Sequence, residues 1–344
     1  SLRKKLVESG SIFQTSSDTE IILQLVARSK KKKLLEKLTD ALFQIQGAYA
    51  LVILTNKKLI GVRDPYGIRP LVLGDKNGSP VLASETCALD MIGAKYVRDV
   101  ENGEVIIITE DGIESVKPFF KVQERPCIFE RIYFASPDSI VDGKTVYTYR
   151  KGLGEQLAIE NNISADVVVP IPDSGVSAAI GFSQTSSIPF ELGIIRSHYV
   201  GRTFIEPSQS IRQFGVKLKH SVNRSCIENK RVILIDDSIV RGTTASKIVK
   251  MVYEAGAKEV HLGISCPPIM HPDFYGIDTP NYEELIASHA SIKEMTKLVG
   301  AKSLFFLTLD GTYKAMGCDK RNALTPQFTC LLYTSDAADD WFCV

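Results

Sequence analysis

Apolar residues recur at helical spacing near the start of the chain. They form two groups, Ile21, Ile22, Leu25 and Val26, then Leu34, Leu35, Leu38, Ala41 and Leu42. This spacing predicts amphipathic helices within residues 19–46. Four lysines at 30–33 separate the groups, and we interpret them as a solvated helix end in preference to a binding patch.

From residue 48 to about residue 121 the pattern changes to short strand-like runs. The runs are YALVIL, KLIGVRD, LVLG, PVLAS, EVIIITED and GIESVKPF. Turn signals lie between them, among them Asp64-Pro65-Tyr66-Gly67 and Asn77-Gly78. Short strands joined by such turns indicate an antiparallel, helix-flanked α+β unit.

After Pro126 the pattern alternates between strands and helices. The expected strands are ADVVVPIP (165–172), FELGIIRS (190–197), VILIDD (232–237) and EVHLGIS (259–265). The expected helices start at Gly175, run from Thr244 to about Glu254, and cover 284–300. Alternation of this kind predicts a parallel sheet wrapped by helices, the α/β class.

Composition narrows the possible functions. The chain has 344 residues, 44% of them hydrophobic and 24% charged, as in an ordinary globular protein. The net charge of +1 leaves no basic surface for nucleic acid, and no apolar run is long enough to span a bilayer. The first residues do not form a signal peptide, so we expect a cytoplasmic protein that binds neither nucleic acid nor membrane.

Residues 232–244, VILIDDSIVRGTT, carry the clearest chemical signal. The apolar run is typical of a central parallel strand, and ligands of such sheets bind beyond the carboxyl ends of the strands. Adjacent carboxylates repel each other unless a cation or a polyhydroxyl ligand balances them. The following Arg241, Gly242, Thr243 and Thr244 supply backbone N–H groups and hydroxyls for a phosphate. The pattern favours a phosphorylated sugar over a simple helix cap, for which one Asp or Thr suffices.

The same motif resembles the signature of type I phosphoribosyltransferases, which bind phosphoribosyl pyrophosphate (PRPP). Flanking segments extend the likeness to the glutamine PRPP amidotransferases: VVVPIPDSGVSAAIGF, HYVGRTFIEPSQSIRQFGVKLKHSVNR, HPDFYGIDTP and EELIASH. Upstream, SIFQTSSDTEIILQL, GAYALVIL and GVRDPYGIRPLVLG resemble the glutaminase domain of that family. The resemblance runs from about Leu2 to Phe328.

This resemblance implies a fold and a reaction. The fold is a partial N-terminal-nucleophile glutaminase α/β sandwich at 1–126, followed by a phosphoribosyltransferase domain at 127–330. Residues 331–344 are an atypical tail, which we interpret as an artefact of expression or sequence assembly. The reaction transfers glutamine-derived ammonia to PRPP, giving 5-phosphoribosylamine, pyrophosphate and glutamate in the first step of purine biosynthesis. Mg²⁺, feedback by purine nucleotides and a homo-oligomer are further implications.

The resemblance also assigns roles around the strand end. Asp236 and Asp237 are implied to hold the ribose hydroxyls and Mg²⁺, with Ser238 beside them. Arg241, Gly242, Thr243 and Thr244 are implied to cradle the 5′-phosphate.

Two further segments gain roles from the resemblance. Asp173, Ser174 and Gly175 match the pyrophosphate loop, with Ser174 as a metal contact. Residues 199–226 match a lid that closes over PRPP, with Tyr199 and Lys219 as binding residues and Arg202 as a catalytic residue beside the two aspartates. A plain surface loop is the alternative, and the segment's length and aromatic residues favour the lid.

The glutaminase half matches less well. The nucleophile of the family is a cysteine at the mature N-terminus, whereas this sequence begins with Ser1 and none of its cysteines is N-terminal. We therefore expect an N-terminally truncated member that depends on ammonia. Only Asp18, in TSSDTE, matches a glutamine-binding position, and an aspartate that caps the following helix is the competing interpretation.

Cysteine chemistry adds little. The seven cysteines are spaced singly, as in reduced cytosolic proteins. An iron–sulfur cluster requires four thiolates, and only Cys127 matches a ligand position of the cluster-bearing relatives. Asp273 stands where those relatives have cysteine. We therefore expect no cluster, and we interpret Cys127 as a buried thiol.

Two other functions fit parts of the pattern. A salvage phosphoribosyltransferase would act on a free base, but it needs no strand-rich region such as 48–121. A PRPP- or nucleotide-binding regulatory module would bind without turnover. The intact Asp236, Asp237, Ser174 and Arg202 argue against the regulatory module.

Overall fold

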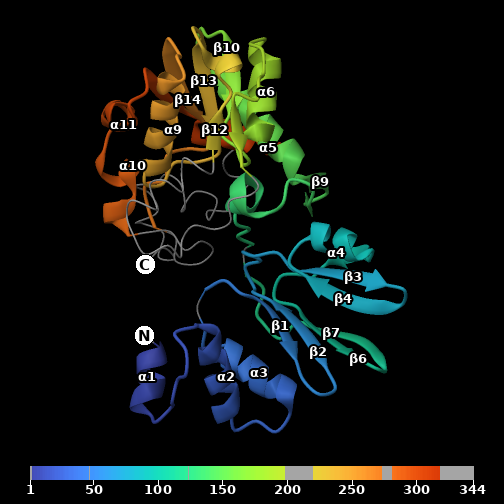
Figure 1. Cartoon of the computed structure of the whole chain (residues 1–344). Coiled ribbons are helices and arrows are strands. Elements are labelled where there is room, and N and C mark those ends of the chain that lie inside the picture. Colours follow the sequence, from blue (N-terminus) through green and yellow to red (C-terminus); the bar gives the residue numbers. More distant parts are fainter. Residues whose placement is uncertain (1, 46, 123, 198–219, 273–280, 318–344) are drawn as a thin grey trace. The chain divides into compact units, whose positions relative to one another are not determined.

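The computed structural model describes residues 2–45, 47–122, 124–197, 220–272 and 281–317 (Figure 1). The chain forms two compact units. Unit 1 comprises residues 1–71 and 99–124, and unit 2 comprises residues 72–98 and 125–344. The chain passes between the units at residues 71/72, 98/99 and 124/125. The expected boundary at 126 lies close to the third of these passages but assigns 72–98 to the first domain. The division into domains therefore stays a prediction.

Three helices begin unit 1. They are α1 (Leu2–Glu8), α2 (Thr19–Arg28) and α3 (Leu34–Leu42). The two helices predicted on either side of the lysine run are thus confirmed. Their apolar faces supply Ile22, Leu38 and Leu42 to a core that also contains Ile60 and Ile107 of the neighbouring sheet.

The sheet of unit 1 has four strands in the order β1-β2-β6-β7. Their bounds are β1 (Ala50–Leu54), β2 (Leu59–Arg63), β6 (Val105–Thr109) and β7 (Gly112–Val116). All three pairings are antiparallel, which confirms the predicted arrangement.

The Asp64-Pro65-Tyr66-Gly67 turn follows β2. The Asp64 carboxylate is fully buried and accepts hydrogen bonds from the backbone N–H groups of Tyr66 at 2.9 Å and Ile68 at 3.2 Å. Burial raises the pKa of Asp64, and these donors oppose that shift. The carboxylate therefore stabilises the turn together with the backbone hydrogen bond from the N–H of Gly67 to the carbonyl oxygen of Asp64.

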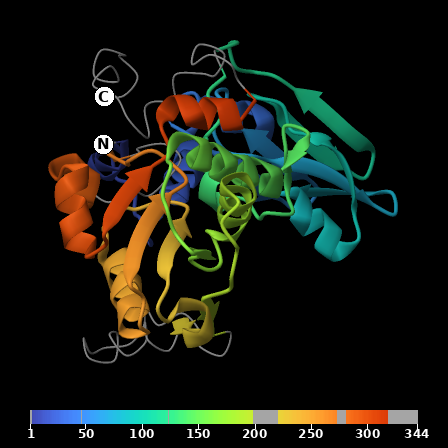
Figure 2. The same ribbon diagram turned by 90° about the horizontal axis from the view of Figure 1, so that it is seen from above.

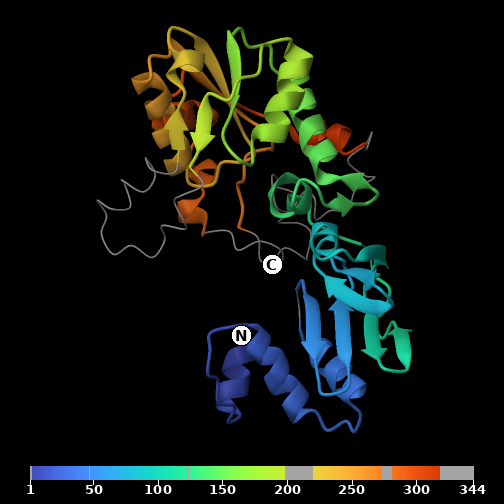
Figure 3. The same cartoon turned by 45° about the vertical axis from the view of Figure 1, so that its right-hand side comes forward.

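Unit 2 begins with a small sheet in the order β4-β3-β5. It consists of β3 (Val72–Lys76), β4 (Ser79–Ala83) and β5 (Lys95–Asp99), with α4 (Thr86–Ile92) packed beside β4 (Figure 3). Asn77 and Gly78 both have positive φ, so the predicted turn is confirmed. The sequence pattern did not predict α4 and β5.

A parallel sheet forms the centre of unit 2, as predicted. Its order is β10-β13-β14-β15, with bounds β10 (Val167–Pro170), β13 (Arg231–Asp236), β14 (Glu259–Ile264) and β15 (Ser303–Phe306). Each neighbouring pair is parallel. The carboxyl ends of all four strands therefore meet at one edge of the sheet.

Helices cover both faces of this sheet (Figures 1 and 2). One group contains α5 (Val146–Glu160), α6 (Val176–Ser186) and α12 (Leu309–Ala315), and the other contains α9 (Thr243–Glu254) and α11 (Ile292–Val299). None of the helices in the described part of the chain is long and apolar enough to cross a membrane.

The helix expected at 284–300 is divided. The structure has a 3₁₀ turn (Tyr282–Glu284), then α10 (Ile286–His289) and α11. Ser291 begins α11 with a capping box, in which its hydroxyl accepts from the N–H of Glu294 and the Glu294 carboxylate accepts from the N–H of Ser291. This cap starts a new helix, and the helical spacing alone did not reveal it.

Short elements connect these parts. They are a π-helix (Glu130–Phe134), β8 (Ile140–Val141), β9 (Lys144–Thr145), β11 (Ile194–Arg196), β12 (His220–Val222) and α8 (Arg224–Ile227). The strand expected at 190–197 is shortened to β11, and it pairs antiparallel with β12 outside the parallel sheet. Within the lid expected at 199–226, residues 220–222 form β12 and residues 224–226 belong to α8.

Glycines let α5 and α6 pack with their backbones nearly in contact. A Cβ atom added to Gly154 would lie 1.8 Å from the carbonyl oxygen of Ala178, and one added to Gly181 would lie 2.0 Å from that of Lys151. Backbone atoms cannot move aside as a flexible side chain can. Both glycines are therefore required for this helix crossing.

We expect Gly154→Ala to lower the free energy of unfolding by about 1–3 kcal/mol, because the added methyl group forces the helices apart. Gly152→Ala is the matched control on the same helix, since its Cβ would lie 3.3 Å from the carbonyl oxygen of Ala315. Thermal melting measures both. Equal melting temperatures for the two variants would contradict the close packing of α5 and α6.

Candidate functional site

The candidate site lies at the carboxyl edge of the parallel sheet. Strand β13 is buried on both faces from Val232 to Ile235 and ends at Asp236. The neighbouring β10 ends at Pro170, which pairs with Ile235. The loop that follows β10 therefore begins beside the paired aspartates.

Two carboxylates and two hydroxyls meet at this edge. Ser174 donates its hydroxyl to Asp236 Oδ1 at 3.3 Å, and the backbone N–H of Asp237 donates to the same oxygen at 3.0 Å. Ser238 donates its hydroxyl to Asp237 Oδ2 at 2.7 Å. The sequence placed these four residues in one site, and the structure brings them together.

Burial raises the pKa of Asp236 well above its ordinary value, and the adjacent charge of Asp237 raises it further. The hydroxyl of Ser174 opposes the shift but does not cancel it. Cys266, buried just after β14, also has a raised pKa because of its burial and the charges of the two aspartates. The edge is thus short of positive charge, and Cys266 stays a thiol.

The loop after β10 approaches β13 through a glycine. A Cβ atom on Gly175 would lie 2.2 Å from the carbonyl oxygen of Ile235, so only glycine fits there. Gly175 is the N-cap of α6, as the sequence predicted for the start of this helix. Asp173 is exposed and forms an ion pair with Arg196 of β11. The Pro172–Asp173 peptide bond is cis.

The turn after β13 presents the start of helix α9. Gly242 is its N-cap with φ +73°, and no side chain caps the helix. Thr243 and Thr244 are exposed in the first turn. An uncapped helix start offers free N–H groups and the positive end of the helix dipole to an anion. Arg241 is exposed and forms an ion pair with Glu284.

The remaining predicted residues are less informative. Tyr199, Arg202 and Lys219, like Asp273, lie outside the described residues. Cys127 is buried, as expected. Asp18 is the N-cap residue of α2, but its side chain makes no capping hydrogen bond, so this competing interpretation is wrong.

Asp236 and Asp237 suit a divalent cation. Within the described residues no three His, Cys, Asp or Glu side chains gather at one point. Mg²⁺ needs fewer protein ligands, because it is commonly bound by one or two carboxylates together with substrate phosphates. The adjacent carboxylates and the raised pKa of Asp236 fit a cation that arrives with a phosphorylated ligand.

Sequence reasoning missed two charged residues of unit 2, Arg150 and Glu85. Arg150 of α5 is 5% exposed, and Glu85 precedes α4. The charges of Asp237 and Glu85 both act on the Arg150 guanidinium. A signal was present, because Arg150 falls on the buried stripe of α5 that also contains Tyr149, Leu153 and Leu157.

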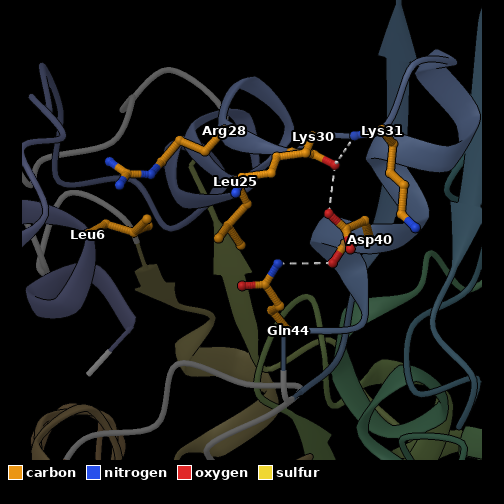
Figure 4. A pocket seen from close by; sticks show the side chains of 8 residues that line it. Leu6, Leu25, Arg28, Lys30, Lys31, Asp40 and Gln44 are labelled. Atoms are coloured by element: carbon orange, nitrogen blue, oxygen red, sulfur yellow. Dashed lines mark hydrogen bonds between the residues drawn. The ribbon is translucent and has the colours of Figure 1, made fainter.

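A hollow with a volume of about 370 Å³ lies in unit 1 (Figure 4). Leu6 and Leu25 line it together with three cationic residues, Arg28, Lys30 and Lys31. Its one carboxylate, Asp40, already accepts a hydrogen bond from the Ser29 hydroxyl at 2.6 Å. The hollow contains none of the predicted site residues.

Comparisons with known proteins support the two kinds of domain predicted from the sequence. Residues 1–91 match a glutamine amidotransferase domain model, and residues 138–286 match a phosphoribosyl transferase domain model. An amidophosphoribosyltransferase of Rhizobium etli is 55% identical over 341 residues, covering 97% of this chain and 69% of the relative. The chloroplastic amidophosphoribosyltransferase 1 of Arabidopsis thaliana is 53% identical, covering 95% of this chain and 58% of the relative.

A solved structure supports the fold. The glutamine PRPP amidotransferase of Bacillus subtilis, complexed with ADP and GMP, superposes with a TM-score of 0.87 at 49% identity. The match covers 93% of this chain and 71% of that chain. The glutaminase and phosphoribosyltransferase fold classes predicted from the sequence are confirmed.

Because Asp236 and Asp237 lie side by side, we expect the stability of the protein to depend on pH. Because the folded-state pKa of Asp236 is raised, its contribution to stability is fully present below the ordinary value near 3.8 and is lost as the pH rises. Asn keeps the Oδ1 acceptor without the charge. We therefore expect Asp236→Asn to melt higher than the wild type by roughly 2–4 °C at pH 7, the effect of 1 kcal/mol in a domain of 150–250 residues.

Melting curves between pH 4 and pH 8 in EDTA measure this difference, which should shrink toward pH 4. Asp90→Asn is the control, because Asp90 is an exposed aspartate of α4. A difference that stays constant with pH would contradict the proposed charge repulsion.

Proposed function

This chain belongs to the amidophosphoribosyltransferase family, and we propose that it transfers ammonia to PRPP, releasing pyrophosphate and forming 5-phosphoribosylamine. In the complete pathway this is the first step of purine biosynthesis. The proposal depends mainly on one hydrogen bond. Ser174, from the loop after β10, is hydrogen-bonded to Asp236 at the end of β13, a few residues before the uncapped start of α9.

We propose that PRPP spans this edge of the sheet. Its 5′-phosphate would accept hydrogen bonds from the backbone of Gly242, Thr243 and Thr244. Its ribose hydroxyls would donate to Asp236 and Asp237, which relieves the repulsion between these carboxylates. Its pyrophosphate would lie along Asp173, Ser174 and Gly175.

Charge explains how these residues promote the reaction. The nitrogen lone pair of ammonia forms a bond to C1 of the ribose as the bond from C1 to the pyrophosphate oxygen breaks, and the sugar carries positive charge in the transition state. The resulting ammonium group on C1 then loses a proton to solvent, which gives the amine. Asp236 and Asp237 stabilise that positive charge. Mg²⁺, held by these carboxylates and the Ser174 hydroxyl, would neutralise charge on the departing pyrophosphate.

The lid residues complete the proposal. Tyr199, Arg202 and Lys219 belong to the segment between β11 and β12, and closure of that segment would exclude water from PRPP. Arg202 would then add positive charge beside the leaving group. A homo-oligomer stays a prediction.

We propose that the nitrogen reaches PRPP as ammonia derived from glutamine, which the glutaminase-type segment would bind. The residues at the carboxyl edge of the parallel sheet act on ammonia whatever its source. Asp18 would be a contact for the amino acid.

Pyrophosphate release from PRPP and Mg²⁺ tests the function. We expect release with an ammonium salt and none with a purine base. Asp236→Asn should lower the rate roughly 100-fold or more, since it removes a charge that stabilises the transition state. Asp90→Asn should match the wild type. Binding of PRPP without turnover would favour the regulatory-module alternative, and turnover with a purine base would refute the proposed reaction.

Feedback by purine nucleotides can be tested in the same assay. The B. subtilis enzyme was solved with ADP and GMP, and we propose that purine nucleotides also bind this chain. Addition of ADP and GMP together should lower the rate with ammonia, whereas the pyrimidine nucleotides CDP and UMP should not. Equal inhibition by both pairs would indicate general competition by phosphate groups.

A further inference from the structure

The turn that leads into α9 packs against a segment far along the chain, residues 282–289. That segment comprises the 3₁₀ turn (Tyr282–Glu284) and the short helix α10. The backbone N–H of Ile286 donates to the carbonyl oxygen of Val240 at 2.9 Å. Because Val240 lies two residues before Gly242, this hydrogen bond joins the segment to the turn immediately ahead of the proposed phosphate cradle.

The side chain of Ile286 closes one side of that turn. Gly242 has a φ of +73°, and a Cβ atom added to it would lie 2.9 Å from Cδ1 of Ile286. Ile286 itself is 6% exposed, and the neighbouring Leu285 and Ala287 are buried as well. Ile286 therefore occupies the space into which a side chain at residue 242 would project, and it is held there by the interior of unit 2.

An ion pair forms a third contact between the two segments. The guanidinium of Arg241 pairs with the carboxylate of Glu284, and both side chains are largely exposed. An exposed pair adds little to the stability of a whole protein. It does, however, fix the direction of one long side chain, and the three contacts together fall on three consecutive residues, 240–242.

The supporting segment has anchors of its own. The Ser288 hydroxyl lies 2.6 Å from the carbonyl oxygen of Tyr282 and 2.8 Å from that of Leu285, and it donates to them. The Tyr282 hydroxyl lies 3.2 Å from Nδ1 of His271, and the two rings meet edge to face at 5.7 Å. The segment is therefore fixed independently of the turn that it supports.

A phosphate cradle built from backbone needs such support. Backbone N–H groups bind an anion well only when they point at it, and preorganised donors bind best. Glycine has more conformational freedom than any other residue. Gly242 would therefore let the start of α9 adopt several orientations unless neighbouring groups hold the turn.

We propose that residues 284–286 position the 5′-phosphate cradle, with Glu284 acting through Arg241 and Ile286 acting through Val240 and Gly242. This inference rests on the proposed function and makes Glu284 and Ile286 positioning residues for it. Loss of either contact should weaken ligands that are held by a 5′-phosphate. Ligands that are held by the proposed pyrophosphate loop at 173–175 should bind as before.

Two inhibitors separate these sites in the ammonia-dependent reaction, followed as radiolabelled pyrophosphate released from labelled PRPP. Ribose 5-phosphate carries only the 5′-phosphate, whereas unlabelled pyrophosphate matches only the other loop. Glu284→Gln removes the charge and keeps the shape of the side chain. It should raise the inhibition constant of ribose 5-phosphate and the KM for PRPP roughly two- to fivefold, the size expected for an exposed ion pair.

The same variant should leave the inhibition constant of pyrophosphate and kcat within about 1.5-fold of the wild type, because it affects binding at one end of PRPP only. Glu283→Gln is the matched control, since Glu283 is exposed in the same 3₁₀ turn. We expect it to behave as the wild type toward both inhibitors.

A double-mutant cycle tests the connection through Arg241. In an Arg241→Gln background, Glu284→Gln should have no further effect on the inhibition constant of ribose 5-phosphate, because the guanidinium that Glu284 holds is gone. Ile286→Val tests the second contact by removing the Cδ1 atom that faces Gly242. It should also raise the inhibition constant of ribose 5-phosphate and leave that of pyrophosphate unchanged.

Several outcomes would overturn the inference. Equal weakening of both inhibitors, or a change in melting temperature alone, would leave residues 284–286 with a general structural role. Tighter binding of ribose 5-phosphate in Glu284→Gln would show that Glu284 competes with the phosphate for Arg241.

The outcomes also separate this inference from the proposed function. A wild type that releases no pyrophosphate overturns the proposed function and this inference with it. An active wild type, with both inhibition constants unchanged in Glu284→Gln and Ile286→Val, overturns only the inference.

Discussion

Repulsion between two adjacent carboxylates is the constraint around which the carboxyl edge of the sheet is arranged. Asp236 and Asp237 end a strand that is buried on both faces, where little water screens their charges. Two donors converge on one oxygen of Asp236, and the Ser238 hydroxyl binds Asp237. The raised pKa of Asp236 means that these contacts leave part of the repulsion in place. That remainder is available to a ligand that brings hydroxyl groups and positive charge.

Close backbone contact allows the same edge to be assembled. Gly175 lets the start of α6 approach the end of β13, and Gly154 and Gly181 let α5 lie directly against α6. This packing holds α5 against α6, the helix that begins in the loop after β10. Gly175 therefore lets the loop after β10 lie against the strand that carries the aspartates, and the other two glycines let α5 support α6 from its far side.

The sequence revealed the parts of this site that are local in the chain. The apolar strand, the paired aspartates and Gly242 lie within thirteen residues, so their spacing predicted an anion-binding turn at a strand end. It did not reveal α5 or Glu85, because their importance comes from contacts across long stretches of chain, such as Glu85 with Ser139. It also read 284–300 as one helix, since the capping box at Ser291 is a side-chain arrangement that periodicity does not report.

The position of residues 72–98 follows from the same long-range contacts. These residues resemble the glutaminase domain in sequence, yet they form part of the compact unit 2. Glu85 binds Ser136 and Ser139, and the neighbouring Thr86 accepts a hydrogen bond from the N–H of Ile140 at 2.8 Å. Partly buried polar groups such as these are costly to leave without partners. These hydrogen bonds connect the segment to the loop that leads into α5. The bounds of the compact units therefore differ from the bounds of the domains predicted from the sequence.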